Sequence, residues 1–103
     1  MRKTTLQKLR DQASVMRRHN MGISQSLVLA KAADKPSTMT HISEESNLHP
    51  VNITGLVDNL EKEGLVVRQP DSDDRRKVIV AATPIGREVM NQIEKALEGG
   101  RDE

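Results

Sequence analysis

Apolar residues in the middle of the chain recur at three- and four-residue spacings and predict a helix over residues 50–63. This spacing places them on one helical face, as expected for a stripe packed against a core. The residues on that face are Ile53, Leu56, Val57 and Leu60. Pro50 suits a first helical position, where its missing N–H would have no partner. Gly64 suits the position just beyond the helix C-terminus.

A shorter helix is predicted upstream, over residues 38–46. Residues 47–49 then form a link of the length found in a helix-turn-helix. The pattern of 38–63 alone is equally compatible with an ordinary helical hairpin, so it does not decide between a DNA-reading unit and a purely structural one.

The pattern changes after Gly64 from helical spacing to short runs rich in β-branched residues. Residues 65–67 and 77–81 predict two strands. The segment between them is polar and contains Pro70 and three aspartates, which is typical of a loop. A hairpin directly after two helices predicts a wing over 65–82. The expected fold class is α+β and mostly helical: a winged helix-turn-helix with a two-stranded β-wing and flanking N- and C-terminal helices.

The flanking segments complete one domain over residues 1–103. Residues 1–20 predict an N-terminal helix, with Thr4 or Thr5 as N-cap. Its expected apolar face comprises Leu6, Leu9, Ala13 and Met16. Residues 23–35 predict a support helix with Ser24 as N-cap.

A last helix is predicted over 84–98, with Thr83 as N-cap and Pro84 in the first turn. Apolar residues repeat along it every four positions: Ile85, Val89, Ile93 and Leu97. Such a stripe either packs on its own domain or meets a second chain. Residues 99–103 are expected to be a frayed tail.

Composition excludes several functions. The 103 residues contain no Phe, Tyr, Trp or Cys, so the core must be aliphatic and thiol chemistry is absent. The three histidines show no metal-ligand spacing, and no nucleophile–base pair or phosphate loop stands out. We therefore expect no enzyme activity, no cofactor and no metal site. With no leader or long apolar run, we expect a cytoplasmic protein without a membrane partner. The net charge is only +1, so any nucleic-acid surface must be local.

The stretch from 53 to 86 closely resembles the MarR/SlyA family of winged helix-turn-helix transcription regulators. The matching residues are Ile53, Thr54, Leu56, Val57, Asp58, Leu60, Glu61, Gly64, Leu65, Val66, Arg68, Pro70, Asp71, Asp73, Asp74, Arg75, Arg76, Thr83 and Gly86. The resemblance implies a dimeric DNA-binding repressor. Helix 50–63 would read the major groove and wing 69–77 the minor groove of double-stranded DNA. It also favours dimerisation through Ile85, Val89, Ile93 and Leu97.

The expected DNA-binding residues follow from groove chemistry and from this resemblance. They are His49, Val51, Asn52, Thr54, Arg75, Arg76 and Lys77. Asn52 can pair with an adenine edge and Val51 can touch a thymine methyl, although each also fits an ordinary helix surface. The resemblance assigns Arg76 to the minor groove. It also makes Asp74 the wing-orienting residue, bonded across the wing to an arginine. Lys31, Lys62 and Arg68 are expected to be ordinary solvated charges.

Other features point away from the family pattern. Gly55 occupies a position where the family often has Arg, which suggests reduced guanine readout. Family members also have longer terminal helices that interlock, so the homodimer that the resemblance implies is expected to be reduced, rearranged or missing here. Many members release DNA when a small-molecule effector binds, but no pocket for one is evident from the sequence. The alternative function is a winged-helix protein-interaction module without DNA binding.

Overall fold

The computed structural model describes residues 3–18 and 21–98, which form a winged helix-turn-helix body with a helical arm. In chain order the helices are α1 (Thr5–Arg18), α2 (Ile23–Asp34), α3 (Met39–Ser46), α4 (Pro50–Lys62) and α5 (Pro84–Leu97). The strands are β1 (Ser37–Thr38), β2 (Val66–Pro70) and β3 (Val78–Ala82). The predicted fold class is thus confirmed. The predicted tail 99–103 and both ends of helix 1–20 lie outside the described residues.

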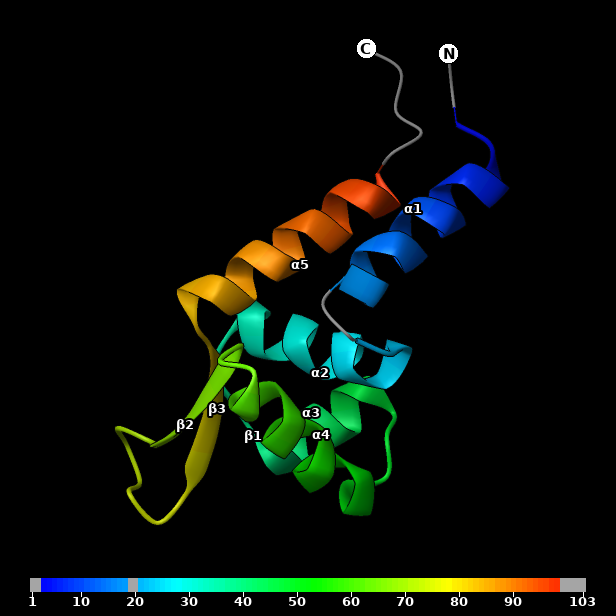
Figure 1. The fold of residues 1–103 in the computed structure, drawn as a ribbon. Helices are drawn as coiled ribbons and strands as arrows, with labels where there is room; N and C mark the ends of the chain where they lie inside the picture. Colours follow the sequence, from blue (N-terminus) through cyan, green and yellow to red (C-terminus); the bar gives the residue numbers. More distant parts are fainter. Residues whose placement is uncertain (1–2, 19–20, 99–103) are drawn as a thin grey trace.

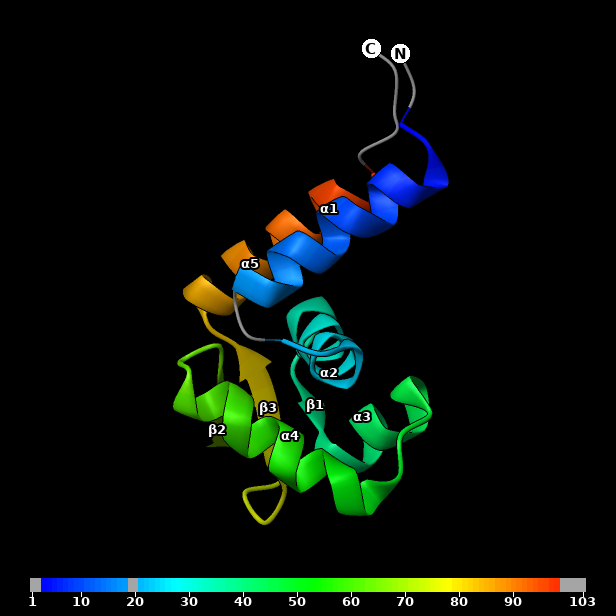
Figure 2. The same cartoon turned by 45° about the vertical axis from the view of Figure 1, so that its right-hand side comes forward.

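The arm consists of α1 and α5 packed side by side, and it projects away from the body (Figures 1 and 2). The start of α1 and the end of α5 lie together at its free end, whereas α3, α4 and the wing lie at the opposite end. The molecule is therefore elongated, with extents of 51 × 25 × 23 Å.

The body is built around α2, which contacts α3, α4, α5 and β3. Val28 and Leu29 of α2 are fully buried. They meet aliphatic residues from each neighbouring element, chiefly Ile42, Ile53, Val57, Leu60, Leu65, Val66 and Val80. The expected aliphatic core is confirmed. Ser24 is not the N-cap of α2: the N-cap is Gly22, two residues earlier, and it donates its N–H to Gln25 Oε1 at 3.1 Å.

The sheet contains one strand more than the predicted wing. Its order is β1-β3-β2, with both pairings antiparallel. Ser37 and Thr38 of β1 lie opposite Val80 and Ile79. A strand of two residues shows no alternation that a sequence pattern could reveal. By pairing with β3, it attaches the start of α3 to the base of the wing.

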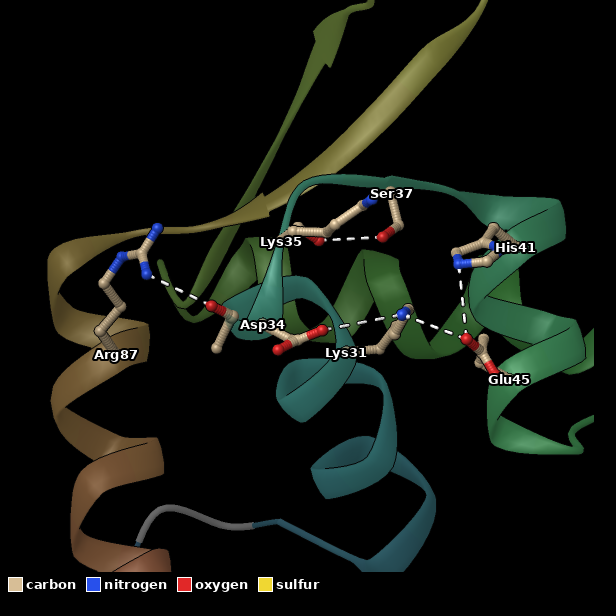
Figure 3. Close-up of polar contacts among 8 residues, drawn as sticks. Lys31, Asp34, Lys35, Ser37, His41, Glu45 and Arg87 are labelled. Carbon is tan, nitrogen blue, oxygen red and sulfur yellow. Dashed lines mark hydrogen bonds and ion pairs between the residues drawn. The ribbon is translucent and has the colours of Figure 1, made fainter.

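Polar contacts connect α2 with α3 and α5 (Figure 3). Lys31 Nζ lies 3.4 Å from Glu45 Oε1, and His41 Nε2 lies 3.6 Å from the same oxygen. Arg87 donates to the carbonyl of Ala33 at 3.3 Å. The Lys31 side chain is only 16% exposed, so its prediction as an ordinary solvated charge is wrong. The aliphatic stem of a lysine can be buried while its ammonium keeps charged partners.

The two flanking helices bury only part of the apolar stripes that the sequence pattern predicted. In α1, Val15 and Met16 are buried, whereas Leu6 and Leu9 are 63% and 58% exposed. The predicted N-cap Thr4 is confirmed by its Oγ1, which accepts from the N–H of Gln7 at 3.1 Å. Because the arm leaves the body, α1 has α5 as its main neighbour and much of its apolar face is uncovered.

In α5, Val89 and Ile93 are buried within their own chain, while Ile85 and Leu97 are 63% and 53% exposed. A four-residue step overshoots one helical turn by about 40°, so a stripe with this spacing winds around the helix and cannot face one neighbour along its whole length. The buried face instead comprises Gly86, Val89, Met90, Ile93 and Ala96. Of the four predicted dimerisation residues, two thus belong to the domain core, which is the alternative that the sequence left open.

Candidate nucleic-acid interface

The turn between α3 and α4 is held by side chains as well as backbone. Asn47 takes a left-handed conformation with φ 56°, which Asn tolerates better than most residues. Buried Ser43 donates its hydroxyl to the carbonyl of Leu48 at 2.6 Å. His49 Nδ1 accepts from the backbone N–H of Val51 at 3.2 Å and so caps α4. These bonds determine how α4 leaves the turn, and with it the direction of its first exposed side chains.

The outer face of the first turns of α4 is open to solvent. Val51 is 78% exposed, and Asn52, Thr54 and Gly55 are also exposed. Ile53 and Val57 are buried on the opposite face. An exposed apolar side chain beside an amide and a hydroxyl can contact base edges, because a major groove offers both methyl groups and hydrogen-bonding atoms.

The loop of the wing is shaped by its own aspartates. Asp71 Oδ1 accepts from the N–H of Asp73 at 3.0 Å, and Asp74 Oδ1 accepts from the N–H of Arg76 at 3.1 Å. The guanidinium of Arg76 also bonds to Asp74, with Nε 3.1 Å from Oδ1. The pair lies within one turn, two residues apart, and not across the wing as the resemblance implied. The Arg76 side chain is 91% exposed, so Asp74 orients a cation that otherwise extends into solvent.

This contact also changes the acidity of the carboxyl group. The hydrogen bond from the Arg76 side chain, followed by that from its backbone N–H, lowers the pKa of Asp74. Hydrogen bonds to the ionised form stabilise it over the neutral form. Asp74 therefore stays ionised, and available to hold Arg76, to a lower pH than an isolated aspartate would.

Arg68 of β2 links the wing to α4, a role that was not predicted from the sequence. Its NH2 group lies 2.6 Å from Asp58 Oδ1 and its NH1 group lies 2.6 Å from Glu61 Oε1. The hydrogen bond to Asp58 is the largest contribution that raises the pKa of Arg68. The prediction of Arg68 as an ordinary solvated charge is thus wrong. Asp58 and Glu61 lie one helical turn apart, and this spacing before a lone strand arginine was the available signal.

The structure brings the predicted DNA-binding residues of α4 and the wing to one end of the molecule, opposite the free end of the arm (Figures 1 and 2). A groove of about 530 Å³ lies between the start of α3 and the loop end of β3. It is lined by Thr38, Met39, Thr40, Lys77 and Val78. The helix-turn-helix and the wing therefore form the two sides of one concave region, with Lys77 inside it.

A second depression lies on the arm side of the body. It has a volume of about 340 Å³ and is mainly apolar. Its lining residues are Leu9, Gln12, Ala13, Met16, Arg17, Met21, Gly22 and Ile23. The described residues contain no group of three or more His, Cys, Asp or Glu that could hold a metal ion. In residues 3–18 and 21–98, no helix has the length and apolar character that crossing a bilayer requires.

Comparison with curated proteins finds transcriptional repressors. The chain is 32% identical over 66 residues to the HTH-type transcriptional repressor YetL of Bacillus subtilis, covering 64% of this chain and 40% of that protein. It is 26% identical over 85 residues to the homoprotocatechuate degradative operon repressor of Escherichia coli, covering 82% of this chain and 57% of that protein. The chain thus spans 40% to 57% of the length of these relatives.

Solved structures show the same fold. The transcriptional regulator Tm0710 of Thermotoga maritima matches with a TM-score of 0.79 and 28% identity, over 90% of this chain and 66% of that one. CouR of Rhodococcus jostii, solved with p-coumaroyl-CoA, matches with a TM-score of 0.78 and 28% identity, over the same shares. The MarR family profile matches residues 21–78, more than half of the chain and the whole path from α2 to the start of β3. On this match and on the winged helix-turn-helix described above, the chain belongs to the MarR family.

Proposed function

We propose that this chain is a DNA-binding transcription regulator that acts as a dimeric repressor. The observation that carries the proposal is the shared placement of two elements. The first turns of α4, which are exposed, and the loop between β2 and β3 lie at the same end of the molecule (Figure 1), and that loop carries the oriented, 91% exposed Arg76. Related proteins named as repressors support the same function.

In this proposal α4 enters the major groove with its N-terminal face toward the bases. Asn52 donates to and accepts from an adenine edge, and Val51 packs on a thymine methyl. Thr54 contacts a base or a phosphate. His49 uses Nδ1 to cap α4, so Nε2 is the ring nitrogen that would donate to a phosphate.

The wing is proposed to reach the neighbouring minor groove. Arg76 would enter it, where a narrow A·T-rich stretch concentrates negative potential. Arg75 and Lys77 would bind phosphates, Lys77 from within the groove beside α3. Asp74 orients Arg76 and keeps one carboxylate away from the DNA backbone by bonding it to a cation.

A second copy of the chain is proposed to cover the free end of the arm. Leu6, Leu9 and Leu97 are 63%, 58% and 53% exposed there. We call them the arm leucines. Uncovered leucines on two adjacent helices favour a helix–helix contact, since burying them removes apolar area from water. A dimer would present two α4 helices to successive major grooves about 34 Å apart.

A small amphiphilic acid is the effector class that the apolar depression fits. Leu9, Met16 and Ile23 offer apolar contacts, and Arg17 in the same lining offers a charge for a carboxylate. CouR, at 28% identity, was solved with p-coumaroyl-CoA. We expect p-coumarate or its thioester to weaken DNA binding, as measured by titration with and without it. If neither compound changes the affinity for DNA, this depression is not the site of an effector of the proposed class.

The test is a titration of the purified chain against genomic and random-sequence duplex DNA at two salt concentrations, with its mass measured by light scattering in the same buffers. A regulator should bind selectively, and its affinity should fall steeply with salt because phosphate binding releases counterions. No binding at low salt by a folded protein would favour the alternative, a protein-interaction module.

Arg76→Ala should weaken DNA binding by about 1–3 kcal/mol, because it removes the proposed minor-groove contact. Lys95→Ala is the matched control: it removes the same charge from an exposed position in the last turn of α5, and α5 leads away from the wing in Figure 1. Equal affinities of the Arg76→Ala variant and the wild-type chain would exclude the wing from the mechanism.

A further inference from the structure

We propose that Arg68 is a positioning residue that sets the direction of the wing relative to α4, so that both can contact DNA at once. The inference rests on the proposed DNA-binding function and names a device within it. It assigns to Asp58 and Glu61 a role in DNA binding that does not require either of them to touch DNA.

The burial of residues along the wing hairpin explains why a positioning contact is needed at Arg68. Val66 of β2 is 1% exposed and belongs to the core. Arg68, the next residue on the same face of the strand, is opposite Val80, which is fully buried. Two pairs further out, Pro70 is opposite Val78, which is 46% exposed. Apolar packing therefore decreases toward the loop, and Arg68 lies at the boundary between the body and the projecting wing.

The contacts of Arg68 constrain direction as well as distance. One terminal nitrogen lies 2.6 Å from Asp58 and the other lies 2.6 Å from Glu61. A guanidinium is planar and its donors have fixed angles, so binding two separate carboxylates determines its orientation on the helix. A lysine ammonium has no such planar fork. The strand that carries Arg68 is thereby attached to two points on α4 one turn apart.

We call Arg68 with its two partners, Asp58 and Glu61, the clamp. The charges of these residues allow a positioning effect on the wing to be distinguished from a simple electrostatic effect on DNA affinity. Asp58 and Glu61 are negative residues on the proposed DNA-reading helix. Removing both charges makes the protein more positive, and by electrostatics alone it should then bind DNA more tightly. If instead these residues hold Arg68, and Arg68 holds the wing, their removal should weaken binding. The two explanations predict changes of opposite sign.

The first experiment therefore measures DNA affinity of the Asp58→Asn, Glu61→Gln double variant. We expect a loss of about tenfold relative to wild type, the scale of one lost directional contact to DNA. The matched control is Asp34→Asn, Glu45→Gln. It changes the charge equally and removes the two carboxylates beside Lys31, away from the wing. Thermal unfolding of each variant, followed by circular dichroism, checks that the fold is kept.

The second experiment is a double-mutant cycle with Arg76→Ala. If the clamp positions the wing, Arg76→Ala should cost much less in the clamp variant than in wild type: about twofold or less instead of about tenfold. Arg68→Lys keeps the charge but not the fork, so it should behave like the double variant. A residue that only stabilises the fold would leave the Arg76 effect unchanged.

The outcomes separate this inference from the function on which it rests. Absence of DNA binding by the wild-type chain would overturn both. If the wild type binds, but the double variant binds as tightly or more tightly and the Arg76→Ala effect is undiminished, only the positioning role of Arg68 is overturned. A loss in the double variant but not in its control, together with a reduced Arg76 effect, would support it.

Discussion

Gly86 lies where the first turn of α5 approaches the start of β2. A Cβ atom there would lie 2.0 Å from the carbonyl oxygen of Leu65 and 3.3 Å from a methyl of Leu29. Thr83 secures the same approach: its N–H donates to Leu65 O at 3.0 Å and its hydroxyl donates to Gly64 O at 2.6 Å. The Thr-x-x-Gly spacing that marked the family in the sequence is therefore a packing requirement, because only glycine allows the helix so close to backbone.

We expect Gly86→Ala to lower the free energy of unfolding by about 1–3 kcal/mol or more, the range for overpacking a core. The clash is with backbone, so no side-chain rotation relieves it. Chemical denaturation followed by circular dichroism measures the change.

Gly55→Ala is the matched control, with the opposite expected sign. A Cβ at Gly55 meets nothing within 4 Å, and the residue lies inside α4 on its exposed side. Alanine should stabilise the chain there by about 0.5–1 kcal/mol, because glycine loses more backbone freedom in a helix. The same sign for both substitutions would contradict the described position of α5.

At the scale of elements, the wing combines a strand pair fastened at its base with a loop organised by Asp71 and Asp74. The carbonyl of Lys77 accepts from Asp71 N–H at 2.9 Å, and Lys77 N–H donates to Asp74 O at 2.9 Å. The loop conformation thus depends on local hydrogen bonds, among them the Asp74–Arg76 contact, which lowers the pKa of Asp74.

This contact should weaken in acid. Because the folded-state pKa of Asp74 is lowered, its stabilising effect is complete above the unfolded value of about 3.9 and is lost as pH falls through the folded value below that. We expect the Arg76 amide and Nε resonances to shift together over that range in an NMR titration. Asp74→Asn should abolish the transition. A shift of Arg76 near neutral pH instead would identify another titrating group.

The whole molecule divides into a body that carries the proposed DNA interface and an arm that carries the three exposed arm leucines. Val89 and Ile93 are 2% and 4% exposed within their own chain. Ile93→Asp would bury a charge in that core and unfold the chain, so it is not a specific probe of dimerisation. The arm leucines are the appropriate targets.

Leu6→Lys combined with Leu97→Glu should convert a dimer into a folded monomer. Both side chains are already exposed, so the substitutions should change the free energy of unfolding of the isolated chain little. They would place charges in an apolar contact. Light scattering measures the mass, and Lys62→Ala, at an exposed position of α4 in the body, serves as a surface control. A double variant that keeps the dimeric mass would place the interface elsewhere.

Much of the fold follows from local pattern. The stripe of Ile53, Val57 and Leu60 correctly located the buried face of α4, because three- and four-residue spacing follows the helical turn closely. Thr83 and Pro84 correctly marked the start of α5, since capping is a local interaction. The polar loop between two β-branched runs located the wing for the same reason.

Other features depend on neighbours that are distant in sequence. The spacing of Asp58 and Glu61 shows that two carboxylates share one face of α4, but it does not show that a strand arginine meets both of them. Likewise, nothing near Leu6 indicates that α1 projects from the body. Val89 and Leu97 belong to the same apolar stripe of α5, but Val89 is buried and Leu97 is exposed. Burial depends on which elements lie opposite each residue. The sequence by itself thus determined the five helices, the wing hairpin, the caps at Thr4 and Thr83, and the family, but not the two-residue strand β1 or the N-cap of α2. Only the tertiary structure decided which faces are covered and how the wing is held against α4, because these are properties of packing between segments and not of any one segment.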